Sequence, residues 1–178
     1  FILFVGTLEP RKNVLRLLHA HDMLAKMGVK DFPLVLAGQK GWKSGPIVEA
    51  VQRRIARGSV RWLGYVPRED LPKLYNACRI FVYPSLYEGF GFPPLEAMAC
   101  GAPVITSNNS ALSDVTGQAA LLVDPINVES IALCMAKLLE DSHLSTSMRE
   151  KGFEQARKYT WEETARQTMG VYQKACSR

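Results

Sequence analysis

The segment Ile80-Phe-Val-Tyr-Pro-Ser-Leu-Tyr-Glu-Gly-Phe-Gly-Phe-Pro-Pro-Leu-Glu-Ala-Met-Ala-Cys-Gly-Ala-Pro-Val-Ile-Thr106 is the clearest indication of the fold of this chain. Short apolar runs at Ile80–Tyr83 and Pro103–Thr106 are typical of strands that are buried on both faces of a parallel sheet. Between them, the Pro-Pro pair suits the first turn of a helix that continues from Leu95 to Cys100. The segment therefore predicts one right-handed strand–helix–strand crossover.

The same alternation extends in both directions along the chain. Further strands are expected at Ile2–Val5, Pro33–Ala37, Val60–Leu63 and Leu121–Val123. Helices are expected after Asn13, which suits an N-cap, at Ile47–Arg57, from about Arg68 to Ala77, and at Val128–Leu139, Ser142–Tyr159 and Trp161–Ala175. The stretch Thr106–Gly117 is expected to be a turn. This pattern predicts an α/β fold, a Rossmann-like doubly wound parallel sheet of about six strands with helices on both faces and a helical C-terminal extension.

Composition places the chain among ordinary globular domains. Of its 178 residues, 47% are hydrophobic and 22% are charged, which is enough apolar material for a core. No window approaches the roughly 18 apolar residues of a membrane span. The chain opens inside a strand, so we expect a piece of a longer protein. Four cysteines without paired spacing indicate free thiols, and we expect a cytoplasmic protein, with a peripheral position at the inner membrane face left open.

The net charge of +5 is unevenly distributed. Residues 1–58 contain ten Lys and Arg against four Asp and Glu, a balance of +6. A basic region can indicate a nucleic-acid partner, but this one contains neither interleaved aromatic residues nor a binding motif. We therefore interpret Arg53, Arg54 and Arg57 as a solvated helix face, and we expect no nucleic acid.

The most specific chemistry lies between Glu88 and Glu96. These carboxylates bracket a Gly-x-Gly turn that leads into a helix N-terminus, where free N–H groups and the positive end of the helix dipole favour an anion. Carboxylates accept hydrogen bonds from vicinal hydroxyls, so the pattern favours a ligand that carries both phosphates and hydroxyls, such as a nucleotide-sugar. The alternative is a plain strand-to-helix turn with a solvated Glu96. A glycosidase acid/base pair is disfavoured, because a neutral glycan gives no use to a phosphate site.

The string from Tyr83 to Val104 resembles the Glu-x7-Glu signature of retaining family 4 glycosyltransferases of the GT-B fold, group 1 type. The resemblance implies that residues 1–178 form the donor-binding half of such an enzyme. Residues 160–178 would then be a helix that crosses back to a missing N-terminal acceptor domain. It further implies a fragment that binds a nucleoside diphosphate but is inactive alone.

The resemblance also assigns roles to individual residues. Glu88 would act at the donor sugar as the catalytic carboxylate, and Glu96 would hold the ribose hydroxyls. Arg11 and Lys12, in a matching Pro-Arg-Lys-Asn loop, would bind the diphosphate, although Thr7 departs from the Gly-Arg pair that is frequent in the family. The remaining donor-binding residues implied by the resemblance are Gly6, Tyr65, Val66, Gly89, Phe90, Gly91, Phe92 and Leu95, with the nucleobase at Tyr65 and Val66.

The resemblance is greatest to mannosyltransferase-type members that build surface polysaccharide. It implies GDP-mannose as the favoured donor, with a UDP-sugar as the alternative, and a glycan or lipid-linked acceptor. Because no Asp-x-Asp motif is present, we expect no metal and no other cofactor. A hypothesis of a different class also stays open, in which the chain is a non-catalytic module that binds a nucleotide or sugar phosphate.

Overall fold

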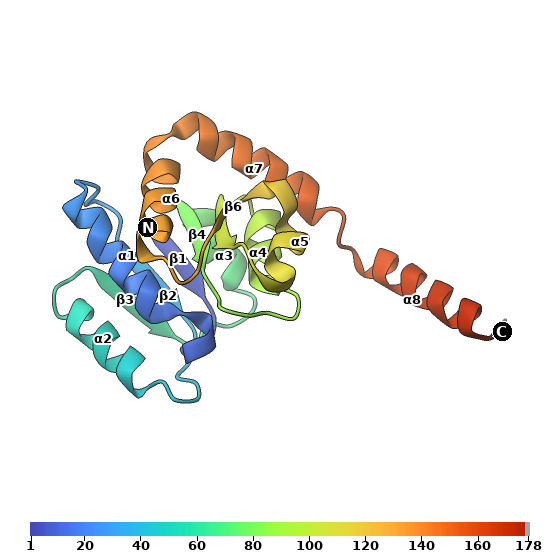
Figure 1. The fold of residues 1–178 in the computed structure, drawn as a ribbon, viewed down its shortest axis with the longest axis horizontal. Coiled ribbons are helices and arrows are strands. Elements are labelled where there is room, and N and C mark those ends of the chain that lie inside the picture. Colours follow the sequence, from blue (N-terminus) through green and yellow to red (C-terminus); the bar gives the residue numbers. More distant parts are fainter. Residues whose placement is uncertain (177–178) are drawn as a thin grey trace.

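The computed structural model describes residues 1–176, which form a six-stranded, entirely parallel sheet with the strand order β3-β2-β1-β4-β5-β6 (Figure 1). The strands are β1 (Ile2–Val5), β2 (Leu34–Ala37), β3 (Val60–Gly64), β4 (Ile80–Tyr83), β5 (Val104–Ser107) and β6 (Ala120–Val123). Four of them, β1, β2, β4 and β5, consist almost wholly of buried residues, as expected for strands that are covered on both faces. The predicted parallel sheet is confirmed.

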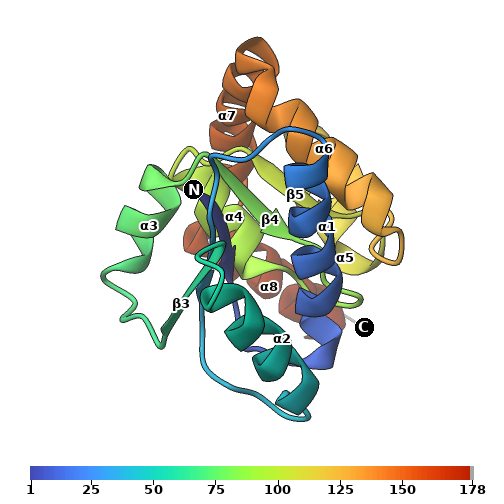
Figure 2. The ribbon, with the colours of Figure 1, turned by 90° about the vertical axis from the view of Figure 1, so that its left-hand side faces the viewer.

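Helices cover both faces of this sheet (Figure 2). The helices are α1 (Val14–Lys26), α2 (Gly45–Ile55), α3 (Leu71–Ala77), α4 (Phe92–Ala99), α5 (Ser110–Thr116), α6 (Val128–Glu140), α7 (Ser142–Ala156) and α8 (Trp161–Cys176). Contacts of α1 with α2 and α6 form one layer, and contacts of α3 with α4 form the other. Helix α7 packs against α4, so the Glu-x7-Glu helix is held from both sides.

The chain reverses its direction of travel across the sheet at β1 and β4, which pair through Ile2 and Ile80. From β1 the chain moves outward to β2 and β3, and from β4 it moves the other way to β5 and β6. Loops that leave the carboxyl ends of β1 and β4 therefore diverge and leave a crevice, which is the usual ligand position in such sheets.

Helix α8 extends away from the body of the molecule (Figure 1). It carries exposed large apolar side chains, among them Trp161 at 76% exposure and Tyr172 at 62%. No helix within the described part of the chain combines the length and the apolarity that a bilayer span requires. Residues 177 and 178, which end the predicted crossing helix, lie outside the described residues.

Three local expectations are wrong. Asn13 occupies the expected N-cap position of α1, but its side chain does not cap the helix: its backbone is left-handed (φ 61°), and its amide donates to two backbone carbonyls of other loops. Arg54 is not solvated: it is 8% exposed, its Nε lies 3.1 Å from both carboxylate oxygens of Asp22, and its Nη1 donates to Ala50. The stretch after β5 is not only a turn, because it contains α5.

Candidate functional site

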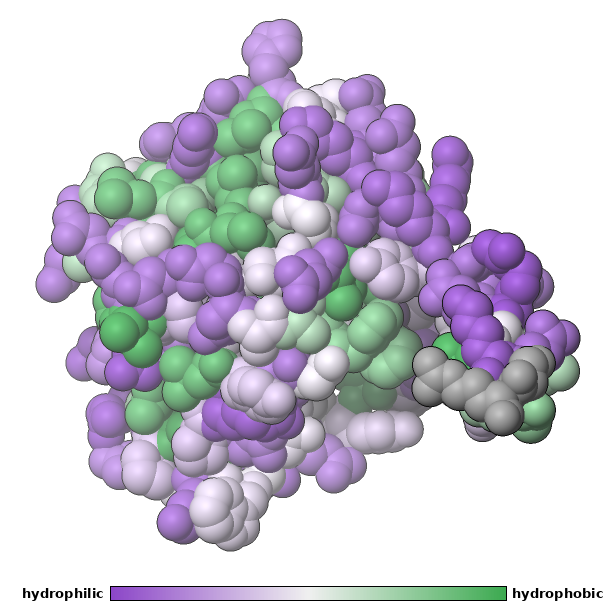
Figure 3. Space-filling model, turned by 45° about the vertical axis from the view of Figure 1, so that its right-hand side comes forward, coloured by the Kyte–Doolittle hydropathy of each residue, from purple (hydrophilic) through white to green (hydrophobic). Residues whose placement is uncertain are grey.

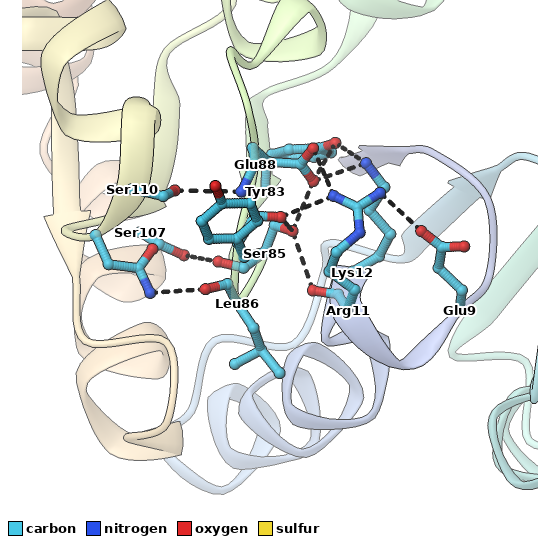
Figure 4. A network of polar contacts seen from close by, with 11 residues as sticks. Glu9, Arg11, Lys12, Tyr83, Ser85, Leu86, Glu88, Ser107 and Ser110 are labelled. Atoms are coloured by element: carbon cyan, nitrogen blue, oxygen red, sulfur yellow. Dashed lines mark hydrogen bonds and ion pairs between the residues drawn. The ribbon is translucent and has the colours of Figure 1, made fainter.

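Glu88 lies in the loop after β4, beside the loop after β1, where the short 3-10 turn Pro10–Lys12 precedes α1. Figure 4 shows side chains from both loops turned toward its carboxylate. Lys12 Nζ and Arg11 Nη1 each lie 2.7 Å from one of its oxygens, Oε1 and Oε2 respectively. The two predicted diphosphate cations and the predicted catalytic carboxylate are thus brought together, from positions more than seventy residues apart in sequence.

Two further groups, which sequence reasoning missed, complete the shell around Glu88. The Tyr83 hydroxyl donates to Oε1 over 3.0 Å and accepts from Lys12, and the Ser85 hydroxyl lies 2.7 Å from the same oxygen. Both residues stand in the Tyr-Pro-Ser string at the end of β4. Their nearness to Glu88 in sequence was an available signal, but a buried tyrosine at a strand end is equally typical of a core residue.

The electrostatics of this cluster favour an ionised Glu88. Burial raises the pKa of Glu88, but hydrogen bonds from Lys12, Ser85 and Arg11 lower it by more, so the net pKa lies below its ordinary value. The pKa of Arg11 is raised, chiefly by its hydrogen bond to Glu88. Burial and the neighbouring carboxylate raise the pKa of the Tyr83 phenol, which therefore remains a hydrogen-bond donor.

The loop after β5 supports the Glu88 loop from the other side (Figure 4). Ser107 Oγ donates to the Ser85 carbonyl over 2.7 Å, and Asn109 Nδ2 donates to the Leu86 carbonyl over 2.9 Å. Ser110 accepts the Glu88 backbone N–H over 3.3 Å and has a left-handed backbone with φ 54°. A non-glycine residue in this region costs free energy, so Ser110 is held there by its surroundings.

The turn into α4 requires Gly91. Its φ is 110°, and a Cβ there would lie 2.7 Å from Leu112 Cδ2, so any other residue would be both strained and obstructed. No side chain caps the helix that starts at Phe92. Because Pro93 and Pro94 carry no N–H, the N–H of Phe92 is the donor that the first turn of α4 leaves without a partner in the helix, and this turn follows directly on the Glu88 loop.

Glu96 lies one helical turn further along α4, at the wall of a cavity of about 640 Å³. The hydroxyl of Tyr75, a fully buried side chain of α3, donates to Glu96 Oε2 over 3.0 Å. This hydrogen bond fixes the carboxylate and leaves Oε1 without a partner within the described residues. Tyr75 is a further supporting residue that the sequence did not reveal.

The other predicted donor-binding residues lie partly in the wall of this cavity and partly in the loops around it. Phe90, Phe92 and Leu95 line the same cavity as Glu96. Tyr65, which is 67% exposed, and Val66 follow β3 and are not part of the cavity lining. Gly6 follows β1 directly, and Gly89 is exposed in the Glu88 loop. Within residues 1–176, no group of three or more His, Cys, Asp or Glu side chains is arranged to hold a metal ion.

Comparisons with known proteins agree with this arrangement. The glycosyl transferases group 1 family model matches residues 1–155. The chain is 44% identical over 172 residues to O-antigen chain mannosyltransferase B of Escherichia coli, which covers 97% of this chain and 45% of that protein. It is 37% identical over 171 residues to the serotype-specific mannosyltransferase WbdA of Escherichia coli, with 93% of this chain and 20% of that protein covered.

A solved structure of sucrose-phosphate synthase from Thermosynechococcus elongatus superposes with a TM-score of 0.85 at 29% identity, over 99% of this chain and 45% of that one. The chain spans less than half the length of these relatives, and the prediction of one half of a GT-B fold is confirmed. With most of its length matched by the family model and two thirds or more of it aligned to each of these relatives, the chain belongs to the glycosyl transferases group 1 family.

Proposed function

We propose that this chain is the donor-binding half of a retaining glycosyltransferase that transfers a hexose, mannose from GDP-mannose, to a glycan or lipid-linked acceptor. The observation that carries the proposal is the Glu88 carboxylate, which four donors from Arg11, Lys12, Tyr83 and Ser85 hold beside the N-terminus of α4. The two mannosyltransferases among the relatives support mannose as the sugar.

The proposed roles follow from charge. A diphosphate carries negative charge that grows as the sugar leaves, and the backbone N–H groups of Gly91 and Phe92, at the start of α4, would stabilise that charge together with Arg11 and Lys12. These two cations now face Glu88, so they are already positioned within one cluster. The lowered pKa of Glu88 keeps its carboxylate ionised. This carboxylate would accept hydrogen bonds from the donor sugar near the reacting carbon.

Glu96 would accept the two ribose hydroxyls. Its Oε2 is oriented by Tyr75, and the neighbouring cavity has room for a nucleoside. In this arrangement the diphosphate lies at the start of α4, the ribose lies one turn along the helix, and the base lies beyond it. Tyr65 and Val66, on the loop after β3, would border the base.

The complete enzyme would need a second domain. We propose that α8 crosses to an N-terminal acceptor domain, because its apolar side chains are exposed along the projecting helix and closure of two lobes completes sites of this kind. Two fixed cations and a helix N-terminus beside the diphosphate position support transfer without a metal ion. We also propose a cytoplasmic enzyme, at the inner membrane face through that domain; three of its four free thiols are at least partly buried.

Titration calorimetry of this chain with GDP and UDP tests the proposal. Wild type should bind nucleoside diphosphates in the presence of a chelator, and Glu96→Ala should weaken GDP by roughly 10- to 150-fold, equivalent to 1.5–3 kcal/mol for hydrogen bonds to a charged group. Glu88→Ala should leave GDP affinity unchanged or increase it, because Arg11 and Lys12 lose their carboxylate partner.

Glu49→Ala is the matched control, since this exposed carboxylate pairs only with Arg53 on α2. Equal losses of GDP affinity in the Glu88 and Glu96 variants would contradict the proposed division of roles. Binding of diphosphates together with full sugar transfer by this chain alone would contradict the need for a second domain. UDP bound at least about tenfold more tightly than GDP, a difference of about 1.4 kcal/mol, would replace the guanine donor.

A further inference from the structure

Arg68 is an arginine in the lining of the Glu96 cavity. It follows β3 and lines this cavity. Within residues 1–176, no side chain or carbonyl accepts a hydrogen bond or ion pair from its guanidinium, whereas the nearby Asp70 is already paired with Lys73. An arginine side chain presents a planar fork of N–H donors. Here this fork is available to a ligand.

The cavity has the chemical character of a nucleoside site. Among the described residues, Arg68 and Glu96 are the only charged ones in its lining, and apolar or aromatic side chains, including Phe92, Leu95 and Trp161, form most of the rest. In Figure 3, hydrophobic atoms lie in the hollow between the body and the projecting helix. A flat heteroaromatic ring with a hydrogen-bonding edge would bury its faces on this surface, because bases pack well on aromatic side chains.

The order of groups along α4 places the base near Arg68. The Phe92 N–H at the start of α4 marks the phosphate end, and Glu96, one turn later, marks the ribose. The other polar groups in the cavity wall are hydroxyls at the start of α8 and just before it, and the guanidinium of Arg68, which comes from the loop before α3 and is the one cation among the described lining residues. When a nucleoside diphosphate has its phosphates at the start of α4 and its ribose at Glu96, the base is the part that remains to contact the guanidinium of Arg68.

We propose that Arg68 reads the Hoogsteen edge of a guanine and so determines the base of the donor; this inference rests on the proposed function. Guanine presents two adjacent acceptors, O6 and N7, which match the two parallel donors of a guanidinium. Adenine presents an amino group where guanine has O6, and uracil has no second adjacent acceptor. Arg68 therefore favours a guanine nucleotide over both.

The test compares GDP, 7-deaza-GDP and UDP by titration calorimetry on this chain and on Arg68→Met, which keeps the apolar stem and removes the fork. In wild type, 7-deaza-GDP lacks one of the two acceptors and should bind roughly tenfold more weakly than GDP. In Arg68→Met, GDP should weaken by about fivefold or more, UDP should change by less than about twofold, and the penalty for 7-deaza-GDP should disappear. Arg57→Met, at an exposed arginine beyond α2, is the control.

The outcomes separate this inference from the function on which it rests. Wild-type chain that binds no nucleoside diphosphate contradicts the proposed function itself. Equal affinity of wild type for GDP and 7-deaza-GDP overturns the reading of guanine and leaves the function standing; this comparison needs no variant, so it holds even if Arg68→Met fails to fold. Equal weakening of GDP and UDP in Arg68→Met also overturns it, because Arg68 would then contact phosphate or ribose.

Discussion

The Asn13 side chain allows a test of how the loops at the carboxyl edge of the sheet are held, because it connects three of these loops. It is 4% exposed. Its Nδ2 donates to the carbonyl of Pro84 over 2.9 Å and to that of Pro125 over 2.6 Å, and its Oδ1 accepts from Arg16 over 2.9 Å. It thereby connects the loop after β1, which carries Arg11 and Lys12, to the loops after β4 and β6.

The cost of Asn13→Ala can be worked out from these contacts. Losing the two buried hydrogen bonds costs about 1 kcal/mol each. An alanine at the φ of 61° adds about 1–2 kcal/mol, because its Cβ crowds the carbonyl in the left-handed region. The free energy of unfolding should therefore fall by about 3–4 kcal/mol, which lowers the melting temperature by roughly 6–16 °C for a domain of this size.

Urea unfolding followed by far-ultraviolet circular dichroism measures this loss, provided that the slope m is unchanged. Asn13→Gly should recover about 1 kcal/mol of it, since glycine adopts this φ freely. Asn127→Ala is the matched control: this asparagine caps α6 through one exposed hydrogen bond to Ser130, and its loss should cost only about 1 kcal/mol. If Asn13→Ala costs no more than Asn127→Ala, the side chain does not tie the loops together.

Three other predictions address the site and the core. Gly91→Ala should lower both the melting temperature and GDP affinity, because its Cβ would lie 2.7 Å from a leucine methyl. Gly89→Ala, whose Cβ would have nothing within 4 Å, should leave the melting temperature within about 2 °C of wild type. Equal melting temperatures for the two variants would refute the strain argument. Since the folded-state pKa of Glu88 is lowered, its charge stabilises the fold above the unfolded pKa of about 4.3, and this stability is lost as pH falls through the folded pKa. In urea unfolding, the free energy of unfolding should therefore fall less between pH 7 and pH 3 in Glu88→Gln than in wild type. An equal fall in both proteins would contradict this prediction. Leu17→Ala, at a fully buried position, should cost about 2–5 kcal/mol in urea unfolding, while Leu133→Ala, at a residue 51% exposed, should cost far less, and similar costs would show that α1 does not pack as described.

Much of the fold was predictable because its signals are local. Each apolar run predicted a strand within about one residue of its observed bounds, and Pro-Pro placed the start of α4 correctly. The helix α5 was missed, since Ser110–Thr116 is short and its start is a left-handed serine. The role of Asn13 was misread because an asparagine before a helix is usually a cap, and only the tertiary fold brings Pro84 and Pro125 within reach of its amide.

The family, the parallel sheet and the two carboxylates could all be identified from the order of residues along the chain, because each depends on a local pattern. How the carboxylates are held depends on contacts that form only when the chain folds. The folded chain places Arg11 and Lys12 on Glu88, Tyr75 on Glu96, and Arg68 in the wall of the same cavity as that carboxylate. These partners come from different loops and helices, and such pairings depend on how the crossovers pack, which spacing within one segment does not specify.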